Sequence, residues 1–216
     1  MIAVMARVPV PGAAKTRLAP ALGADGAAAL AAAMAGDVLD TVRATGLPYR
    51  VCVAGPMASA WVAELGGGCF LGVEAQPDGD LGARLAHALR DGGVAIGTDA
   101  PLLSAGLLRT AADALARGWA DVVLAPAQDG GYVLVGCVAR LAASMFEGVP
   151  WSSDTTFRAQ VARCHALGVS PLVLPGGADV DTPGDLERLR ADLRAASALA
   201  PRTRAFLEAL DAAPLR

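Results

Sequence analysis

The residues of this sequence that could do chemistry are acidic and basic side chains placed at the ends of short apolar runs. Asp99 ends the run Val94–Thr98, which is bounded by turn residues and suits a strand buried on both faces. In open α/β folds, ligands bind at the carboxyl ends of the strands. A lone Asp at a strand end can also do no more than cap a turn. We take Asp99 as a candidate catalytic residue and metal ligand.

A basic loop follows the first predicted strand, Ile2–Val8. Its sequence, Pro9–Leu18, lacks the glycines that a P-loop requires at fixed positions. Gly12 nevertheless lets backbone N–H groups approach an anion, and Lys15 and Arg17 bring two cations to the strand end. We therefore expect Gly12, Lys15 and Arg17 to bind phosphate, with an ordinary basic loop as the alternative.

Two further carboxylates, Asp179 and Asp181, precede a predicted helix start near the end of the chain. Thr182 suits the N-cap of that helix and Asp185 suits its third position, where it completes a capping box. Asp179 and Asp181 have no such local role. We expect Asp181, with Asp179 in reserve, to meet Asp99 around a divalent cation, Mg²⁺ or Mn²⁺.

The stretch 76–84 leads into another predicted helix, with leucines repeating at helical spacing from position 81. Asp80 is well placed as its N-cap. Arg84 is a cation in the first turn, where the helix dipole disfavours it. This misfit indicates either a nearby anion or plain solvent exposure. We count Gln76, Asp80 and Arg84 among the expected nucleotide-binding residues.

The sequence Asp129-Gly130-Gly131-Tyr132 lies between two apolar runs and predicts a β-hairpin, in which Asp129 is only a turn residue. A hairpin there makes one strand antiparallel, so the predicted sheet is mixed. The alternative is an acceptor site. Asp129 would then be a catalytic residue that orients or deprotonates a hydroxyl, Gly130 and Gly131 would leave room for a ligand, and Tyr132 and Trp151 would stack on a sugar.

Strands and helices alternate along the chain without a long linker or repeat, which predicts a single α/β domain spanning residues 1–216. The other predicted helices cover residues 24–45, 57–65, 107–117, 140–146 and 202–211, together with one that runs from the cap cluster 152–154 to 167. The other predicted strands cover residues 49–54, 69–76, 121–127, 132–137 and 171–174.

The composition excludes several classes of protein. A net charge of −3 without a basic stripe argues against nucleic acid as a partner. The longest apolar run, Ala27–Ala35, is too short to span a bilayer, so we expect no membrane association. The four cysteines are far apart and no His/Cys cluster exists, which indicates reduced thiols and no zinc site. With no signal peptide at the N-terminus, we expect a cytoplasmic protein.

Four motifs together resemble a family of GT-A-type, nucleotide-diphospho-sugar-transferase-like proteins that are often described as glycosyltransferases, some associated with arsenosugar biosynthesis. The motifs are P-V-P-G-A-A-K-T-R-L at Pro9–Leu18, G-T-D-A-P at Gly97–Pro101, D-G-G-Y-V-L-V-G at Asp129–Gly136 and D-V-D-T-P-G-D-L at Asp179–Leu186. The G-D-L-G-A-R stretch at Gly79–Arg84 and Trp151-Ser152 also fit. The first and last motifs also resemble phospholactate and molybdenum-cofactor guanylyltransferases.

The resemblance implies a mixed, mainly parallel sheet sandwiched by helices, with a nucleotide at the strand carboxyl ends. It places Asp99 where GT-A proteins hold Mg²⁺ or Mn²⁺ on a nucleotide diphosphate, with Lys15 beside it as a catalytic cation. The function implied is glycosyl transfer from a nucleotide sugar to a small-molecule acceptor. Nucleotidyl transfer from a nucleoside triphosphate to a small phosphorylated substrate, with release of pyrophosphate, is the alternative. Non-catalytic nucleotide binding is a third.

Overall fold

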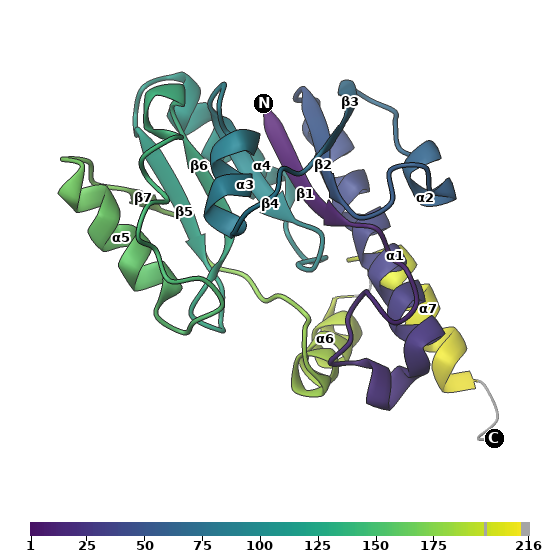
Figure 1. Cartoon of the computed structure of the whole chain (residues 1–216). Helices are drawn as coiled ribbons and strands as arrows, with labels where there is room; N and C mark the ends of the chain where they lie inside the picture. Colours follow the sequence, from purple (N-terminus) through teal and green to yellow (C-terminus); the bar gives the residue numbers. More distant parts are fainter. Residues whose placement is uncertain (197, 213–216) are drawn as a thin grey trace.

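The computed structural model describes residues 1–196 and 198–212 and consists of one twisted sheet with helices on both faces (Figure 1). Seven strands form the sheet, in the order β3-β2-β1-β4-β6-β5-β7. The strands are β1 Ile2–Arg7, β2 Tyr49–Ala54, β3 Phe70–Ala75, β4 Gly93–Gly97, β5 Val122–Pro126, β6 Tyr132–Cys137 and β7 Leu172–Val173. The helices are α1 Ala19–Thr45, α2 Ala60–Ala63, α3 Leu81–Ala88, α4 Ala105–Ala116, α5 Thr156–Ala166, α6 Pro183–Ala195 and α7 Pro201–Ala212, with a 3₁₀ turn η1 at Ala139–Leu141.

The sheet is mixed, as the hairpin motif predicted. β6 pairs antiparallel with both β4 and β5, whereas every other pairing in the sheet is parallel. The carboxyl ends of β1, β2 and β4 therefore meet at one edge. Fold class and hairpin were predicted correctly from the sequence.

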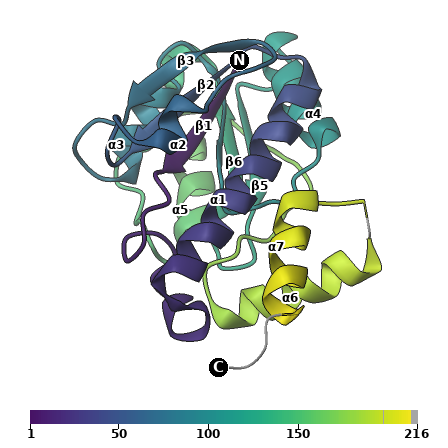
Figure 2. The same ribbon diagram turned by 90° about the vertical axis from the view of Figure 1, so that its right-hand side faces the viewer.

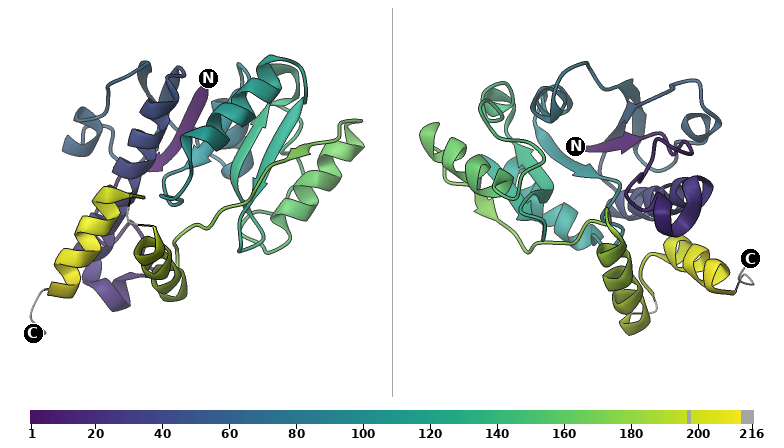
Figure 3. Two further views of the ribbon diagram at one scale, coloured as in Figure 1. Left: turned by 180° about the vertical axis from the view of Figure 1, so that it is seen from behind. Right: turned by 60° about the horizontal axis from the view of Figure 1, so that its bottom comes forward.

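The pleat of the strands divides the core into two layers. In β1, Ile2 and Val4 face a layer that includes Val38 of α1 and Leu108 of α4. Ala3 points the other way, into a layer formed with residues of α3 and α5. Figure 3 shows from behind how α4 lies over the strands. Helices on both faces explain why the central strands are apolar at nearly every position.

A third, smaller core lies beyond the carboxyl edge of the sheet. Figure 2 shows α7 beside the middle of α1, with α6 below. Leu18 and Leu30 pack there against Val180, Leu186 and further residues of α6 and α7. By length and apolar composition alone α1 would qualify as a membrane-spanning helix. Its buried residues instead contact the sheet and α7.

Several predicted element boundaries were wrong. α1 begins at Ala19 and continues through Gly23, a kink with φ of 73° that glycine permits. The helix predicted over 57–65 shrinks to Ala60–Ala63, and the one predicted over 140–146 is a 3₁₀ turn followed by further turns. α5 starts after Thr155, which makes no side-chain cap, and the hydroxyl of Ser153 accepts a hydrogen bond from the backbone N–H of Thr155.

Candidate functional site

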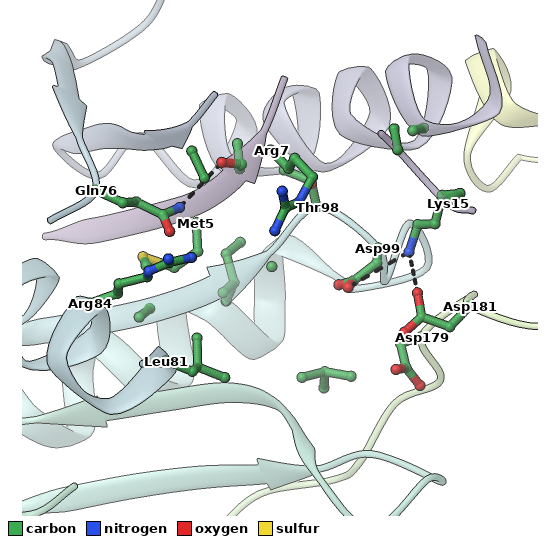
Figure 4. A pocket seen from close by; sticks show the side chains of 18 of the residues that line it. Met5, Arg7, Lys15, Gln76, Leu81, Arg84, Thr98, Asp99, Asp179 and Asp181 are labelled. Carbon is green, nitrogen blue, oxygen red and sulfur yellow. Dashed lines mark hydrogen bonds and ion pairs between the residues drawn. The ribbon is translucent and has the colours of Figure 1, made fainter. Parts of the chain in front are cut away.

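A pocket of about 660 Å³ opens at the carboxyl edge of the parallel strands β1 and β4, where the order of strand connections reverses and leaves a crevice. Its walls come from the loop after β1, from α3, from the end of β4 and from the connection before α6 (Figure 4). The polar lining residues are Arg7, Lys15, Thr16, Arg17, Gln76, Arg84, Thr98, Asp99, Tyr132, Asp179 and Asp181. The pocket is large enough for a nucleotide-sized ligand.

The acidic end of this pocket gathers three aspartates that are far apart in the sequence. Asp99 follows β4, and its backbone carbonyl accepts a hydrogen bond of 3.0 Å from the N–H of Val180. This bond brings Asp179 and Asp181 to the same rim as Asp99 (Figure 4). Burial, followed by the charges of Asp129, Asp99 and Asp181, raises the pKa of Asp179 to about 6.

Lys15 lies between two of these aspartates. Its Nζ donates to Oδ1 of Asp181 at 2.6 Å and lies 3.8 Å from Oδ2 of Asp99. The sequence shows no local partner for Asp181, and the partner that the structure shows, Lys15, lies 166 positions away along the chain. Lys15 was expected on the phosphates, but in this structure its ammonium is paired with carboxylates.

The other cations of the pocket have no acidic partner within the part of the chain that the structure describes. Arg17 is exposed on the loop after β1, and Arg7 is the last residue of β1. Arg84 lines the pocket from α3, and its buried Nε has no hydrogen-bond partner. These guanidinium groups are available to an anion. Sequence reasoning missed Arg7, although a basic residue ending a buried strand was a usable signal.

Gln76 is held rigidly at the opposite end from the aspartates (Figure 4). Its Nε2 donates to the carbonyl oxygens of Ala6, at 3.2 Å, and Cys52, at 2.8 Å. Two carbonyl partners fix which end of the amide is the nitrogen. Oε1 therefore remains as an acceptor at the pocket wall.

Two residues expected to bind the nucleotide lie elsewhere. Asp80 is the N-cap of α3 and accepts a hydrogen bond of 2.8 Å from the N–H of Ala83, as its capping role predicts, but it does not line the pocket. Gly12 is exposed in the loop, where its φ of 76° makes the turn, and the pocket is lined from Ala13 onward. Neither position contacts the pocket directly.

The expected acceptor residues are mostly structural. The carboxylate of Asp129 accepts a hydrogen bond of 2.8 Å from the N–H of Gly131, as in an ordinary turn. Gly130 has a φ of 91°, and a Cβ there would overlap the backbone carbonyl of Asp154. The space that Gly130 leaves is thus filled by the chain itself, and the idea that it makes room for a ligand was wrong.

The two expected aromatic contacts differ from each other. Trp151 packs on Gly82 of α3 and against Phe146, with ring centroids 6.2 Å apart, so it supports α3 and is not among the residues lining the pocket. Tyr132 does line the pocket. Its buried hydroxyl has no hydrogen-bond partner among the residues that the structure describes. Burial raises the pKa of Tyr132, so the phenol stays protonated and can donate.

Solved structures with the same fold include several transferases. A protein from Desulfovibrio desulfuricans G20 described as a "putative nucleotide-diphospho-sugar transferase" is 28% identical, with a TM-score of 0.84 over 98% of this chain and 95% of its own. A cytidylyltransferase from Leptospira borgpetersenii is 14% identical, with a TM-score of 0.56 over 89% and 85%. Rv0371c from Mycobacterium tuberculosis H37Rv, in complex with manganese, is 22% identical, with a TM-score of 0.50 over 87% and 97%.

The description of the first of these neighbours agrees with the resemblance seen in the motifs, and all three share the fold. No curated protein matches the sequence. A family match covers residues 38–153, which is more than half of the chain and includes β2 to β6 with Asp99 and Asp129. The chain therefore belongs to the DUF2064 family, described as uncharacterized proteins conserved in bacteria.

Proposed function

We propose that the protein is a metal-dependent transferase that moves a glycosyl group from a nucleotide sugar to a small acceptor. The observation that carries this proposal is the division of one pocket into an acidic end, at Asp99 and Asp181, and a basic wall, at Arg7, Arg17 and Arg84. A diphosphate with a bound metal ion needs carboxylates for the metal and cations for the phosphate oxygens. The first neighbour, named for nucleotide-diphospho-sugar transfer, aligns over nearly the whole chain.

The donor residues at the acidic end suit Mg²⁺ or Mn²⁺. Mg²⁺ binds through one or two carboxylates together with phosphate oxygens and water. Among the described residues, no group of three or more His, Cys, Asp or Glu side chains could hold a metal ion by itself. In our proposal the nucleotide phosphates supply the remaining ligands. Asp99 and Asp181 would hold the ion, with Asp179 beside them. A bound cation would neutralise charge that develops on the departing diphosphate.

The other lining residues would have different roles in phosphate binding, nucleotide binding and proton transfer. Arg17 and Arg84 would bind the phosphates through charge-assisted hydrogen bonds and stabilise the leaving group. The free Oε1 of Gln76 can accept a hydrogen bond from the donor nucleotide. Asp179, whose pKa is raised to about 6, is better placed than Asp129 to accept a proton from an acceptor hydroxyl, because Asp179 lines the pocket and Asp129 does not.

Nucleotidyl transfer is the second candidate. The K-T-R-L loop that carries Lys15 resembles guanylyltransferases, and the structure brings this lysine to the carboxylates. In that reaction a small phosphorylated substrate attacks a nucleoside triphosphate and pyrophosphate leaves. The same clamp of carboxylates and arginines serves a triphosphate as well as a diphosphate.

Product analysis separates these candidates. The protein is incubated with Mn²⁺ and pooled nucleotide sugars or nucleoside triphosphates, together with pooled small acceptors. Release of nucleoside diphosphate supports glycosyl transfer, release of pyrophosphate supports nucleotidyl transfer, and tight binding without either product supports a non-catalytic nucleotide-binding protein. Asp99→Asn should abolish product formation and leave the fold intact. Full activity in excess chelator would contradict the metal dependence.

A further inference from the structure

Lys15 lies between the two carboxylates to which the proposed function assigns a divalent cation. Its Nζ contacts Asp181 and lies within ion-pair distance of Asp99. The lysine side chain is 13% exposed, whereas those of Asp99 and Asp181 are 41% and 43% exposed. The ammonium is therefore the buried member of the trio and neutralises charge at the acidic end.

The loop holds Lys15 in place with a strained backbone conformation. Lys15 has a φ of 46°, in the left-handed region that side chains other than glycine rarely adopt. Its carbonyl accepts a hydrogen bond of 2.8 Å from the N–H of Leu18, whose side chain is fully buried. Strained residues of this kind concentrate at functional sites and change conformation in switching. The loop thus presents a lysine that new contacts could redirect.

We propose that Lys15 acts as an internal counter-ion that keeps divalent metal out until a nucleotide arrives. The ammonium occupies Oδ1 of Asp181, and its positive charge disfavours a second cation beside the same two carboxylates. A polyphosphate bound at Arg17 and Arg84 offers Lys15 new anionic partners. When the Lys15 ammonium moves to these phosphates, Asp99 and Asp181 become free to bind the metal. Metal and nucleotide then bind cooperatively, and the coupling is reciprocal. This inference rests on the metal site of the proposed function.

The test measures Mn²⁺ binding to the protein without nucleotide, by titration calorimetry. The wild-type protein should bind weakly, and Lys15→Met should bind Mn²⁺ at least about tenfold more tightly, within the usual range of coupling between sites. Arg17→Met is the matched control, because it removes one cation from the same pocket without freeing a carboxylate. The double variant Lys15→Met with Asp181→Asn should lose the gain.

Equal Mn²⁺ affinity in wild type and Lys15→Met would overturn the proposal, as would an equal gain in Arg17→Met, which would indicate only the general charge of the pocket. Lys15→Gln repeats the measurement with a polar neutral side chain should Lys15→Met fail to fold. Because the titration contains no nucleotide or acceptor, it reports on the lysine alone. Failure of the proposed function would appear separately, as missing product in the wild-type assay.

Discussion

Asp179 allows a quantitative test of the acidic end through stability, without knowledge of the substrate. Burial raises its pKa from 3.8 to about 6, and the carboxylates of Asp129, Asp99 and Asp181 add to the effect. Between these two pH values the folded chain holds a proton that the unfolded chain has already released. Stability must therefore fall as the pH rises through this interval, and the loss is complete above pH 6.

The magnitude follows from the width of the interval. One pH unit corresponds to about 1.4 kcal/mol, so an interval of about two units gives a ceiling near 3 kcal/mol. Asp179 is only partly buried, and solvent screening reduces this to about 1–2 kcal/mol. Asp179→Asn removes the charge and keeps the shape. At pH 7.5 the variant should be more stable by that amount, which is about 2–8 °C in Tm for a chain of this size.

The assay is thermal unfolding at pH 4.5 and pH 7.5, in chelator, because a bound cation would mask the repulsion. The gain should be complete at the higher pH and should shrink to about a third at the lower one, which lies only a little above the unfolded pKa of 3.8. Asp78→Asn, an exposed aspartate outside the pocket, is the control and should change Tm little at either pH. A gain of the same size at both pH values, or no gain at pH 7.5, would refute the electrostatic reasoning.

Three further changes test other parts of the structure. Arg84→Met should weaken nucleotide binding by about 1–3 kcal/mol, measured by calorimetry, and unchanged affinity would remove Arg84 from the site. Gly130→Ala should lower stability in urea by about 2–4 kcal/mol, because its positive φ and the carbonyl of Asp154 both oppose a Cβ. Gly118→Ala, also at positive φ but with open space around it, is the control and should lose only about 1 kcal/mol. Asp37→Ala should lower stability by about 2–4 kcal/mol in the same assay, because the buried carboxylate of Asp37 accepts hydrogen bonds from the backbone N–H groups of Arg202 and Thr203 at the start of α7. A loss of stability under about 1 kcal/mol would contradict that capping role.

The parts of the fold that depend on local chemistry could be predicted from the sequence. The capping box of Thr182 and Asp185 and the N-cap Asp80 are present as expected, because cap geometry involves residues only a few positions apart. The hairpin at Asp129 follows from the same kind of local signal. Boundaries were less predictable. The glycine kink in α1 and the shift of the α5 start past Ser153 depend on how the rest of the chain packs.

The site was predictable as a set of strand-end residues, and much less so as a set of contacts. That Asp99 and Asp181 share a rim follows from the parallel topology, so sequence reasoning could anticipate it. The insertion of Lys15 between them, and the packing of Trp151 beneath α3, require side-chain positions that no local pattern encodes. Motif reasoning assigned Trp151 and Gly130 to the acceptor because aromatic and glycine residues can serve ligands or packing equally well.

The small third core explains how three distant segments present their charges to one point. Leu18 ends the loop that carries Lys15, Val180 lies between Asp179 and Asp181, and both are buried in that core with Leu186 of α6. Val180 also donates its N–H to the carbonyl of Asp99. One cluster beyond the sheet edge thus sets the spacing between the lysine and both aspartates. A change in the packing of α6 or α7 would alter the charged end of the pocket, although neither helix contributes a lining side chain.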